Sequence, residues 1–143
     1  MTPLNRLNLV IDTNVLLVSI PSKSSYHWFF QALLQKKFNA FVTTEILSEY
    51  EEIVGNKLGS QTARHLIRML VELDNVFHTT VYFKYQLIQQ DPDDDKFVDC
   101  AISSNAHFIV THDKHFEILE KVAFPKIKTI TLEVLQKILI QVS

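Results

Sequence analysis

The segment LNLVID, residues 7–12, is a short apolar run that ends in an aspartate. A second run of this kind, HFIVT at residues 107–111, lies in the second half of the chain. Neither run alternates polar with apolar residues, which is typical of strands in a parallel sheet that is covered on both faces. Because predicted strands and helices alternate along the chain, the sequence predicts an α/β fold around a central, mainly parallel sheet.

The remaining elements follow from apolar periodicity and from capping residues. Strands are also expected at residues 38–43, 75–83 and 126–131, and helices at residues 24–37, 44–58, 60–73, 94–105, 113–122 and 132–141. Thr43 or Thr44 is expected to cap the helix at 44–58, and Ser60 is expected to cap the helix that follows it. The chain contains no repeat and no linker, so residues 1–143 are expected to form a single domain.

Composition excludes several classes of protein. Apolar residues make up 47% of the chain, which is enough to form a core. The only cysteine, Cys100, cannot form an internal disulfide, which fits a reducing, cytoplasmic setting and excludes a zinc site made of several cysteines. No apolar run reaches the roughly 20 residues that span a bilayer, so no membrane association is expected. The two glycines are too few for a phosphate-binding loop, and the net charge of −2 means that nucleic acid must meet a local basic face.

Two aspartates stand where predicted strands end. Asp12 closes the run at residues 7–12, and Asp113 closes the stretch FIVTHD. Ligands of parallel sheets gather beyond the carboxyl ends of the strands. Helix capping explains Asp113 about as well as a functional role does. Asp12 is harder to explain in that way, because the chain continues apolar after it and a charge at the edge of a core needs a partner.

The helix at residues 44–58 carries four glutamates, and helical geometry sorts them. With about 100° per residue, Glu45 and Glu52 point away from the apolar stripe and are expected to be solvated. Glu49 and Glu51 lie at opposite borders of that stripe. Spacing alone therefore leaves these two as alternatives for a carboxylate that faces the interior.

The stretch QQDPDDDKFVDC, residues 89–100, places four aspartates within five positions. Asp91 and Asp93 are expected to form a turn and a cap together with Pro92. Acidic residues in a first turn are also stabilised by the helix dipole, by about 0.3–1 kcal/mol each. These effects account for two or three aspartates, but not for one that points inward.

The helical period distinguishes the later aspartates of this stretch. It places Asp94 at the middle of the inward face, Asp95 just outside that face and Asp99 further out. Inward carboxylates repel one another, and no lysine or arginine is placed in the sequence to neutralise all of them. A hard divalent cation with oxygen ligands, Mg²⁺ or Mn²⁺, would neutralise them.

Four blocks together resemble the PIN-domain ribonucleases, most closely the toxin components of bacterial toxin–antitoxin pairs. The blocks are VIDTNVLL, TTEILSEYEEIV, DPDDDKFVDCAI and AHFIVTHDKHFEIL, and they cover nearly the whole chain in order. The resemblance implies a three-layer α/β/α sandwich with a central, mainly parallel sheet. It also implies an acidic cluster that binds one or two Mg²⁺ or Mn²⁺ ions.

The resemblance assigns the acidic positions residue by residue. The four positions are Asp12, Glu49, Asp94 and Asp113, and polar residues that support them are Asn14 and Thr111. Asp95 replaces Asp94 as the third acidic position if the match to the family motif is shifted by one residue. The first, third and fourth acids are expected to hold metal, while the second positions the attacking water or a second ion. His112 and His115 flank the fourth acid, and they are expected on the surface or behind the ligands rather than as ligands themselves.

The substrate of such an enzyme needs a basic rim. The candidates are Lys57, Arg64, Arg68, Lys96 and Lys114. Phosphate contacts by these groups would make affinity depend on salt, although solvation of a surface helix explains them equally well.

The clustered acids predict metal-dependent hydrolysis of phosphodiester bonds. The resemblance implies that the substrate is RNA and that the chain acts as the toxin of a toxin–antitoxin pair. The expected partners are an RNA substrate, an antitoxin protein and a second copy of the chain. The apolar residues of the last helix are expected to pack on the sheet, or to leave a spare face for such a partner. The alternatives are a non-catalytic binding module with an acidic pocket and a structure-specific nuclease that acts on DNA or RNA.

Overall fold

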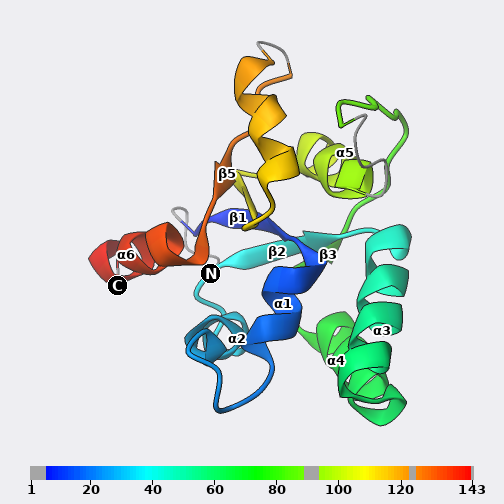
Figure 1. The fold of residues 1–143 in the computed structure, drawn as a ribbon, viewed down its shortest axis with the longest axis vertical. Coiled ribbons are helices and arrows are strands. Elements are labelled where there is room, and N and C mark those ends of the chain that lie inside the picture. Colours follow the sequence, from blue (N-terminus) through cyan, green and yellow to red (C-terminus); the bar gives the residue numbers. More distant parts are fainter. Residues whose placement is uncertain (1–5, 89–93, 123–124, 143) are drawn as a thin grey trace.

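The structure is a computed structural model that describes residues 6–88, 94–122 and 125–142. The turn predicted at Asp91, Pro92 and Asp93 lies outside the described residues. The remainder of the chain folds around one five-stranded sheet (Figure 1).

All neighbouring strands of the sheet run parallel. The strands are β1 (Asn8–Ile11), β2 (Asn39–Val42), β3 (Val76–His78), β4 (Phe108–Val110) and β5 (Thr129–Ile130), in the spatial order β3-β2-β1-β4-β5. β1 lies at the centre of this order, and Leu9 and Val10 are fully buried because both faces of the sheet are covered. The absence of alternation in the first apolar run is thereby explained.

The helices form the two outer layers. One layer holds α1 (Thr13–Ser19), α2 (His27–Leu34), α3 (Thr44–Leu58) and α4 (Ser60–Glu72), and the other holds α5 (Asp95–Ser104) and the 3-10 helix η2 (Lys114–Lys121). The last helix, α6 (Leu132–Val142), follows β5 at one end of the sheet. The predicted three-layer α/β/α sandwich is confirmed (Figure 1).

The chain leaves β1 and β4 toward opposite faces of the sheet. After β1 it enters α1 in one layer, and after β4 it enters η2 in the other. Adjacent parallel strands whose connections diverge in this way open a crevice at their carboxyl ends, where ligands of open α/β sheets bind. The register pairs Ile11 with Val110, so Asp12 and Thr111 emerge side by side at that crevice.

Several predicted boundaries shift for local reasons. Thr43 caps α3 as predicted, and its side chain accepts a hydrogen bond from the backbone N–H of Ile46 at 3.1 Å. Ser60 is not a cap, because Gly59 takes that position with φ of 99° and Ser60 becomes the first helical residue. The helix predicted from residue 24 begins at His27, since the backbone N–H of His27 bonds to the carbonyl of Ser24 in a turn.

Other predicted elements are shorter or differently wound than the sequence indicates. The strand expected at 75–83 ends at His78, and the one expected at 126–131 is limited to Thr129–Ile130. The helix expected at 113–122 forms as the 3-10 helix η2. The predicted elements keep their order, but α1 (Thr13–Ser19) is an additional helix that the sequence did not predict.

The last helix packs as predicted through part of its apolar face. Leu132 and Leu135 are fully buried, while Ile138 and Leu139 are partly buried against the core. Across the described residues, no helix combines the length and the apolar character that crossing a bilayer requires.

Candidate functional site

Asp12 lies at the carboxyl end of β1 and is almost completely buried. Its Oδ2 accepts a hydrogen bond from the hydroxyl of Thr111 at 2.8 Å, and its backbone N–H donates to the carbonyl of Val110 at 3.1 Å. Burial raises the pKa of the Asp12 carboxyl, and the negative charges of Asp113 and Glu49 raise it further, against the opposing effect of the Thr111 hydrogen bond. Asp12, Glu49 and Asp113 therefore share one electrostatic environment.

Thr111 connects two of the predicted acids. Its hydroxyl oxygen donates to Asp12 and also accepts a hydrogen bond from the backbone N–H of Asp113 at 3.0 Å. The structure thus places Thr111 between these two carboxylates. Asn14, the other residue expected to support the site, is exposed on α1.

Glu49 is the glutamate of α3 that faces the site, whereas Glu51 is exposed. Its Oε2 accepts a hydrogen bond from the Thr13 hydroxyl, and its Oε1 pairs with the Lys96 ammonium at 2.6 Å. Thr13 was not singled out by the sequence, although it directly follows Asp12. Lys96, expected on the basic rim, instead has its ammonium on Glu49 with only 15% of its side chain exposed.

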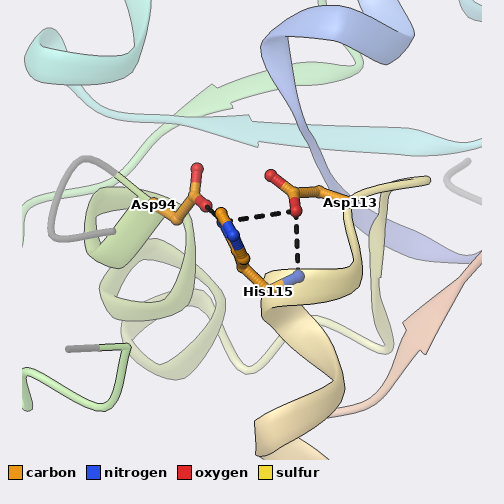
Figure 2. Close-up of side chains that lie close together, drawn as sticks. All are labelled: Asp94, Asp113 and His115. Carbon is orange, nitrogen blue, oxygen red and sulfur yellow. Dashed lines mark hydrogen bonds and ion pairs between the residues drawn. The ribbon is translucent and has the colours of Figure 1, made fainter. Parts of the chain in front are cut away.

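Asp94 and Asp113 face each other across the crevice, with His115 between them (Figure 2). The Nδ1 atom of His115 lies 3.4 Å from Oδ1 of Asp113 and 3.8 Å from Oδ2 of Asp94. Among the residues that the structure describes, these three form the one group whose potential ligand atoms all lie within 4.8 Å of one another. Two of the four predicted acids therefore meet directly, while Asp12 and Glu49 lie outside this closest group.

The two histidines beside Asp113 behave differently. His112 lies on the rim, where its Nε2 is 3.0 Å from Oε1 of Glu133. His115 had been expected on the surface or behind the ligands, and its half-exposed ring lies against two of the predicted acids. The local cause is η2: Asp113 caps this helix by accepting from the backbone N–H of His115 at 2.9 Å, which brings the ring back over the capping carboxylate. Spacing of two residues from a capping aspartate is the pattern that could have indicated this.

The aspartates after Asp94 meet backbone amides. Oδ1 of Asp95 accepts from the N–H of Ile88 at 2.8 Å, and Oδ1 of Asp99 accepts from the N–H of Tyr85 at 3.0 Å. Asp99 had been expected further outside the inward face than Asp95, and it is buried because the irregular segment 79–88 covers that side of α5. Burial raises the pKa of the Asp99 carboxyl above its ordinary value.

The predicted basic residues divide by their position. Lys114 is exposed beside Asp113, while Lys57, Arg64 and Arg68 are exposed on α3 and α4. Lys57 follows Glu49 by eight residues of one helix, which is about 12 Å along the axis. A groove of about 330 Å³ adjoins the site at Lys96, and its other lining residues are Thr43, Thr44, Glu45, His78, Thr79, Thr80, Val81, Lys84 and Asp99.

The donor set at the crevice fits a divalent cation. Asp94 and Asp113 offer carboxylate oxygens, and His115 offers an imidazole nitrogen. Two carboxylates and one ring leave a net negative charge in either state of the ring, so a cation bound there would be stabilised. Carboxylate oxygens suit Mg²⁺ and Mn²⁺.

Residues 8–115 match the sequence profile of the PIN domain. The match runs from the first residue of β1 to His115, so it contains all four predicted acidic positions. The chain belongs to the PIN domain family. PIN domains are generally nucleases, and the acidic cluster of this PIN domain lies at the carboxyl ends of its strands.

Solved structures share this fold. The crystal structure of VapBC2 from Rickettsia felis, bound to a DNA fragment from their promoter, has a TM-score of 0.60 at 16% identity and covers 87% of this chain and 98% of that chain. The PIN domain endonuclease Utp24 gives a TM-score of 0.50 at 18% identity, over 87% and 84% of the two chains. The T. brucei RRP44 PIN domain gives 0.54 at 14% identity, over 96% and 83%. A comparison with curated proteins found no match.

Proposed function

We propose that this PIN domain is a metal-dependent ribonuclease whose acidic residues are Asp12, Glu49, Asp94 and Asp113. The observation that carries the proposal is the approach of Asp94 and Asp113 to one another, with Asp12 near enough to Asp113 for their charges to interact. Carboxylates from three separate parts of the chain converge there, and their mutual repulsion has no use in a purely structural role. Family membership supports nuclease chemistry, and the site supports a cation.

Each acid has a distinct task in this proposal. Asp94 and Asp113 hold the cation, and Asp12, kept in orientation by Thr111, completes the negative pocket. Glu49, fixed by Thr13 and Lys96, orients the attacking water and accepts its proton at a carboxylate oxygen. A bound Mg²⁺ or Mn²⁺ supplies a lowered pKa for water and neutralises charge that develops on the phosphate. Neither a serine nor a cysteine nucleophile is needed.

RNA is the substrate that we propose for the groove beside the site. Lys84 lines this groove, and threonine hydroxyls and His78 add hydrogen-bonding groups. Lys96 lines it from its ion pair with Glu49, and Glu45 and Asp99 are the acidic residues of the lining. These groups can contact phosphate and sugar oxygens without reading sequence. Lys114 beside the acids, and the more distant Lys57, Arg64 and Arg68, would extend the contact, and binding should weaken as salt rises.

The toxin role rests on likeness alone. VapBC2 from Rickettsia felis is the structure that supports it, and we propose an antitoxin protein as a partner of this chain. On α6, Val134 is 48% exposed and Ile140 is 68% exposed, which gives the partner, or a second copy, an apolar contact. Co-expression with a small neighbouring reading frame tests this: a specific complex that suppresses cleavage is expected, and unchanged cleavage contradicts the toxin role.

The central test is cleavage of single-stranded RNA, tRNA and flapped DNA by the purified chain. Cleavage of RNA should require Mg²⁺ or Mn²⁺ and should stop when a chelator is added. Asp12→Asn should abolish it while the circular dichroism spectrum stays unchanged. Asp74→Asn is the matched control, because Asp74 is an exposed aspartate whose partner is Lys36.

Each other outcome of this test supports a different reading. Undiminished cleavage by Asp12→Asn overturns the proposed site. Absence of cleavage at every metal concentration indicates a binding module instead of an enzyme. Preference for flapped DNA indicates a structure-specific nuclease.

A further inference from the structure

We propose that His115 is a third ligand of the cation, through Nδ1, and that it makes the site favour transition ions such as Mn²⁺ and Co²⁺ over Mg²⁺. The proposal rests on the metal dependence proposed above and adds a nitrogen donor to an otherwise oxygen-only set. It concerns which ion the site selects.

Two of the three separations between the donor atoms, those from His115 to each aspartate, are close to the separations around one shared ion, and the third is within 4.8 Å. Ligands about 2.1 Å from a metal and about 90–110° apart lie about 3.0–3.4 Å from each other. Nδ1 of His115 is 3.4 Å from Oδ1 of Asp113 and 3.8 Å from Oδ2 of Asp94. The first value already matches and the second requires a shift of a few tenths of an ångström. Figure 2 shows the ring directed between the two carboxylates.

The surroundings hold the carboxylates more firmly than the ring. The Asp94 side chain is enclosed, with 11% of it exposed, and the Asp113 carboxylate is held by the hydrogen bond with which it caps η2. The side chain of His115 is 47% exposed, so it can adjust its angle without disturbing the core. A more exposed third donor beside two more enclosed donors has room to adapt to the radius of the ion.

An ordinary ion pair between histidine and carboxylate looks different in this protein. His112 approaches Glu133 on the rim, where both groups are well exposed. His115 approaches two carboxylates, with the charge of Asp12 nearby, so the ring cannot neutralise the group in either state. A divalent cation can do so, and this is the reason to assign the ring a ligand role.

The chemical identity of the donor atom determines which ion is bound more tightly because of His115. Mg²⁺ prefers oxygen ligands and retains its waters, so an imidazole nitrogen adds little to its affinity. Affinity for nitrogen-containing sites rises from Mn²⁺ to Co²⁺ along the first transition series. The loss of His115 should therefore reduce affinity most for Co²⁺, less for Mn²⁺ and least for Mg²⁺.

The test is a set of calorimetric titrations of the full chain with each of these three ions, without RNA, at one mildly alkaline pH. His115→Asn should lose about tenfold or more in Co²⁺ affinity, with a smaller loss for Mn²⁺ and almost none for Mg²⁺. His65→Asn is the matched control, because His65 is an exposed histidine on α4. It should leave all three affinities unchanged.

A spectroscopic measurement identifies the nitrogen directly. Pulsed electron paramagnetic resonance of bound Mn²⁺ should show coupling to a histidine nitrogen in the parent and in His65→Asn, and none in His115→Asn. An unchanged ratio of Co²⁺ to Mg²⁺ affinity in His115→Asn, or nitrogen coupling that persists there, overturns the proposal.

The outcome is separable from that of the proposed function, which is measured as RNA cleavage. Ion selectivity that depends on His115 in a chain that cleaves no RNA supports the ligand and refutes the nuclease. RNA cleavage by a chain whose ion selectivity is the same in the parent and in His115→Asn supports the nuclease and refutes the ligand role of His115.

Discussion

Two neighbouring regions of α5 use aspartates in opposite ways. At the crevice, Asp94 meets the side chains of Asp113 and His115. On the other side of the helix, Asp95 and Asp99 each accept a hydrogen bond from a backbone N–H of the segment 79–88. A carboxylate that receives an amide N–H serves as an anchor, whereas carboxylates that face each other create a demand for a cation. The crowded aspartates therefore have two different roles, and the change from one role to the other falls between the consecutive residues Asp94 and Asp95.

Substitution of the two consecutive aspartates should give the largest contrast. Asp94→Asn is expected to lower RNA cleavage about 10²–10³-fold, because it removes one preorganised charge from the reacting centre. Asp95→Asn retains an oxygen that can accept from Ile88, so its loss should be far smaller. Single-turnover cleavage rates across a Mn²⁺ titration measure both.

The same titration distinguishes metal binding from folding. Excess Mn²⁺ should partly restore Asp94→Asn but have little effect on Asp95→Asn. If Asp95→Asn were the more damaged variant, the register of the acidic motif would be shifted by one residue and the contrast between the two regions would be reversed.

Removal of the anchors should destabilise the segment that they hold. Asp95→Ala and Asp99→Ala are each expected to lower the free energy of unfolding by about 1–3 kcal/mol, since each leaves an amide N–H without its charged acceptor. Hydrogen exchange at Tyr85 should accelerate in Asp99→Ala, and that at Ile88 in Asp95→Ala. Asp99→Asn, which keeps an acceptor oxygen, is the control. Equal protection of both amides in all variants would show that the carboxylates do not anchor the segment.

Much of this arrangement follows from local sequence. Runs without alternation predicted a covered parallel sheet, and the ends of two such runs placed Asp12 and Asp113 at one edge. The helical period placed Asp94 inward, because a single helix determines which of its residues face the sheet. Predictions of this kind succeed when one element alone sets the geometry.

The remaining features depend on segments that are distant in sequence. Thr13 reaches Glu49 across 36 positions, and Lys96 reaches Glu49 across 47. The helical angle of Asp99 could not predict its burial, because the covering segment has no regular structure. Amphipathic patterns carry no information about such coverage, so these contacts become visible only in three dimensions.

The ion pair between Lys96 and Glu49 joins the two regions, since Lys96 directly follows the first anchor. Both side chains are largely buried, so a double-mutant cycle of Lys96→Met and Glu49→Gln should give a coupling free energy of about 1–2 kcal/mol. The pair of Lys36 and Asp74 has a similar distance of 2.8 Å but is exposed, and its coupling should be small and disappear in high salt. Equal coupling and equal salt dependence for both pairs would show that burial does not strengthen the ion pair between Lys96 and Glu49.

A third face of α5 points into the core and takes part in neither region. There burial, with a smaller effect of the Asp99 charge, raises the pKa of the Cys100 thiol from 9.0 to about 12. Below pH 9 both the folded and the unfolded chain keep this proton, so Cys100 adds no pH dependence. Above pH 9 the unfolded thiol ionises while the folded thiol stays protonated, so the free energy of unfolding falls as pH rises.

The difference between the parent and Cys100→Ala isolates this effect from the titration of lysine and tyrosine. Between pH 9 and 10 the parent should lose about 1 kcal/mol more stability than the variant in urea unfolding. The loss should continue up to about pH 12, where the folded thiol ionises as well. Parallel stability curves for the two chains would mean that solvent reaches this face of α5.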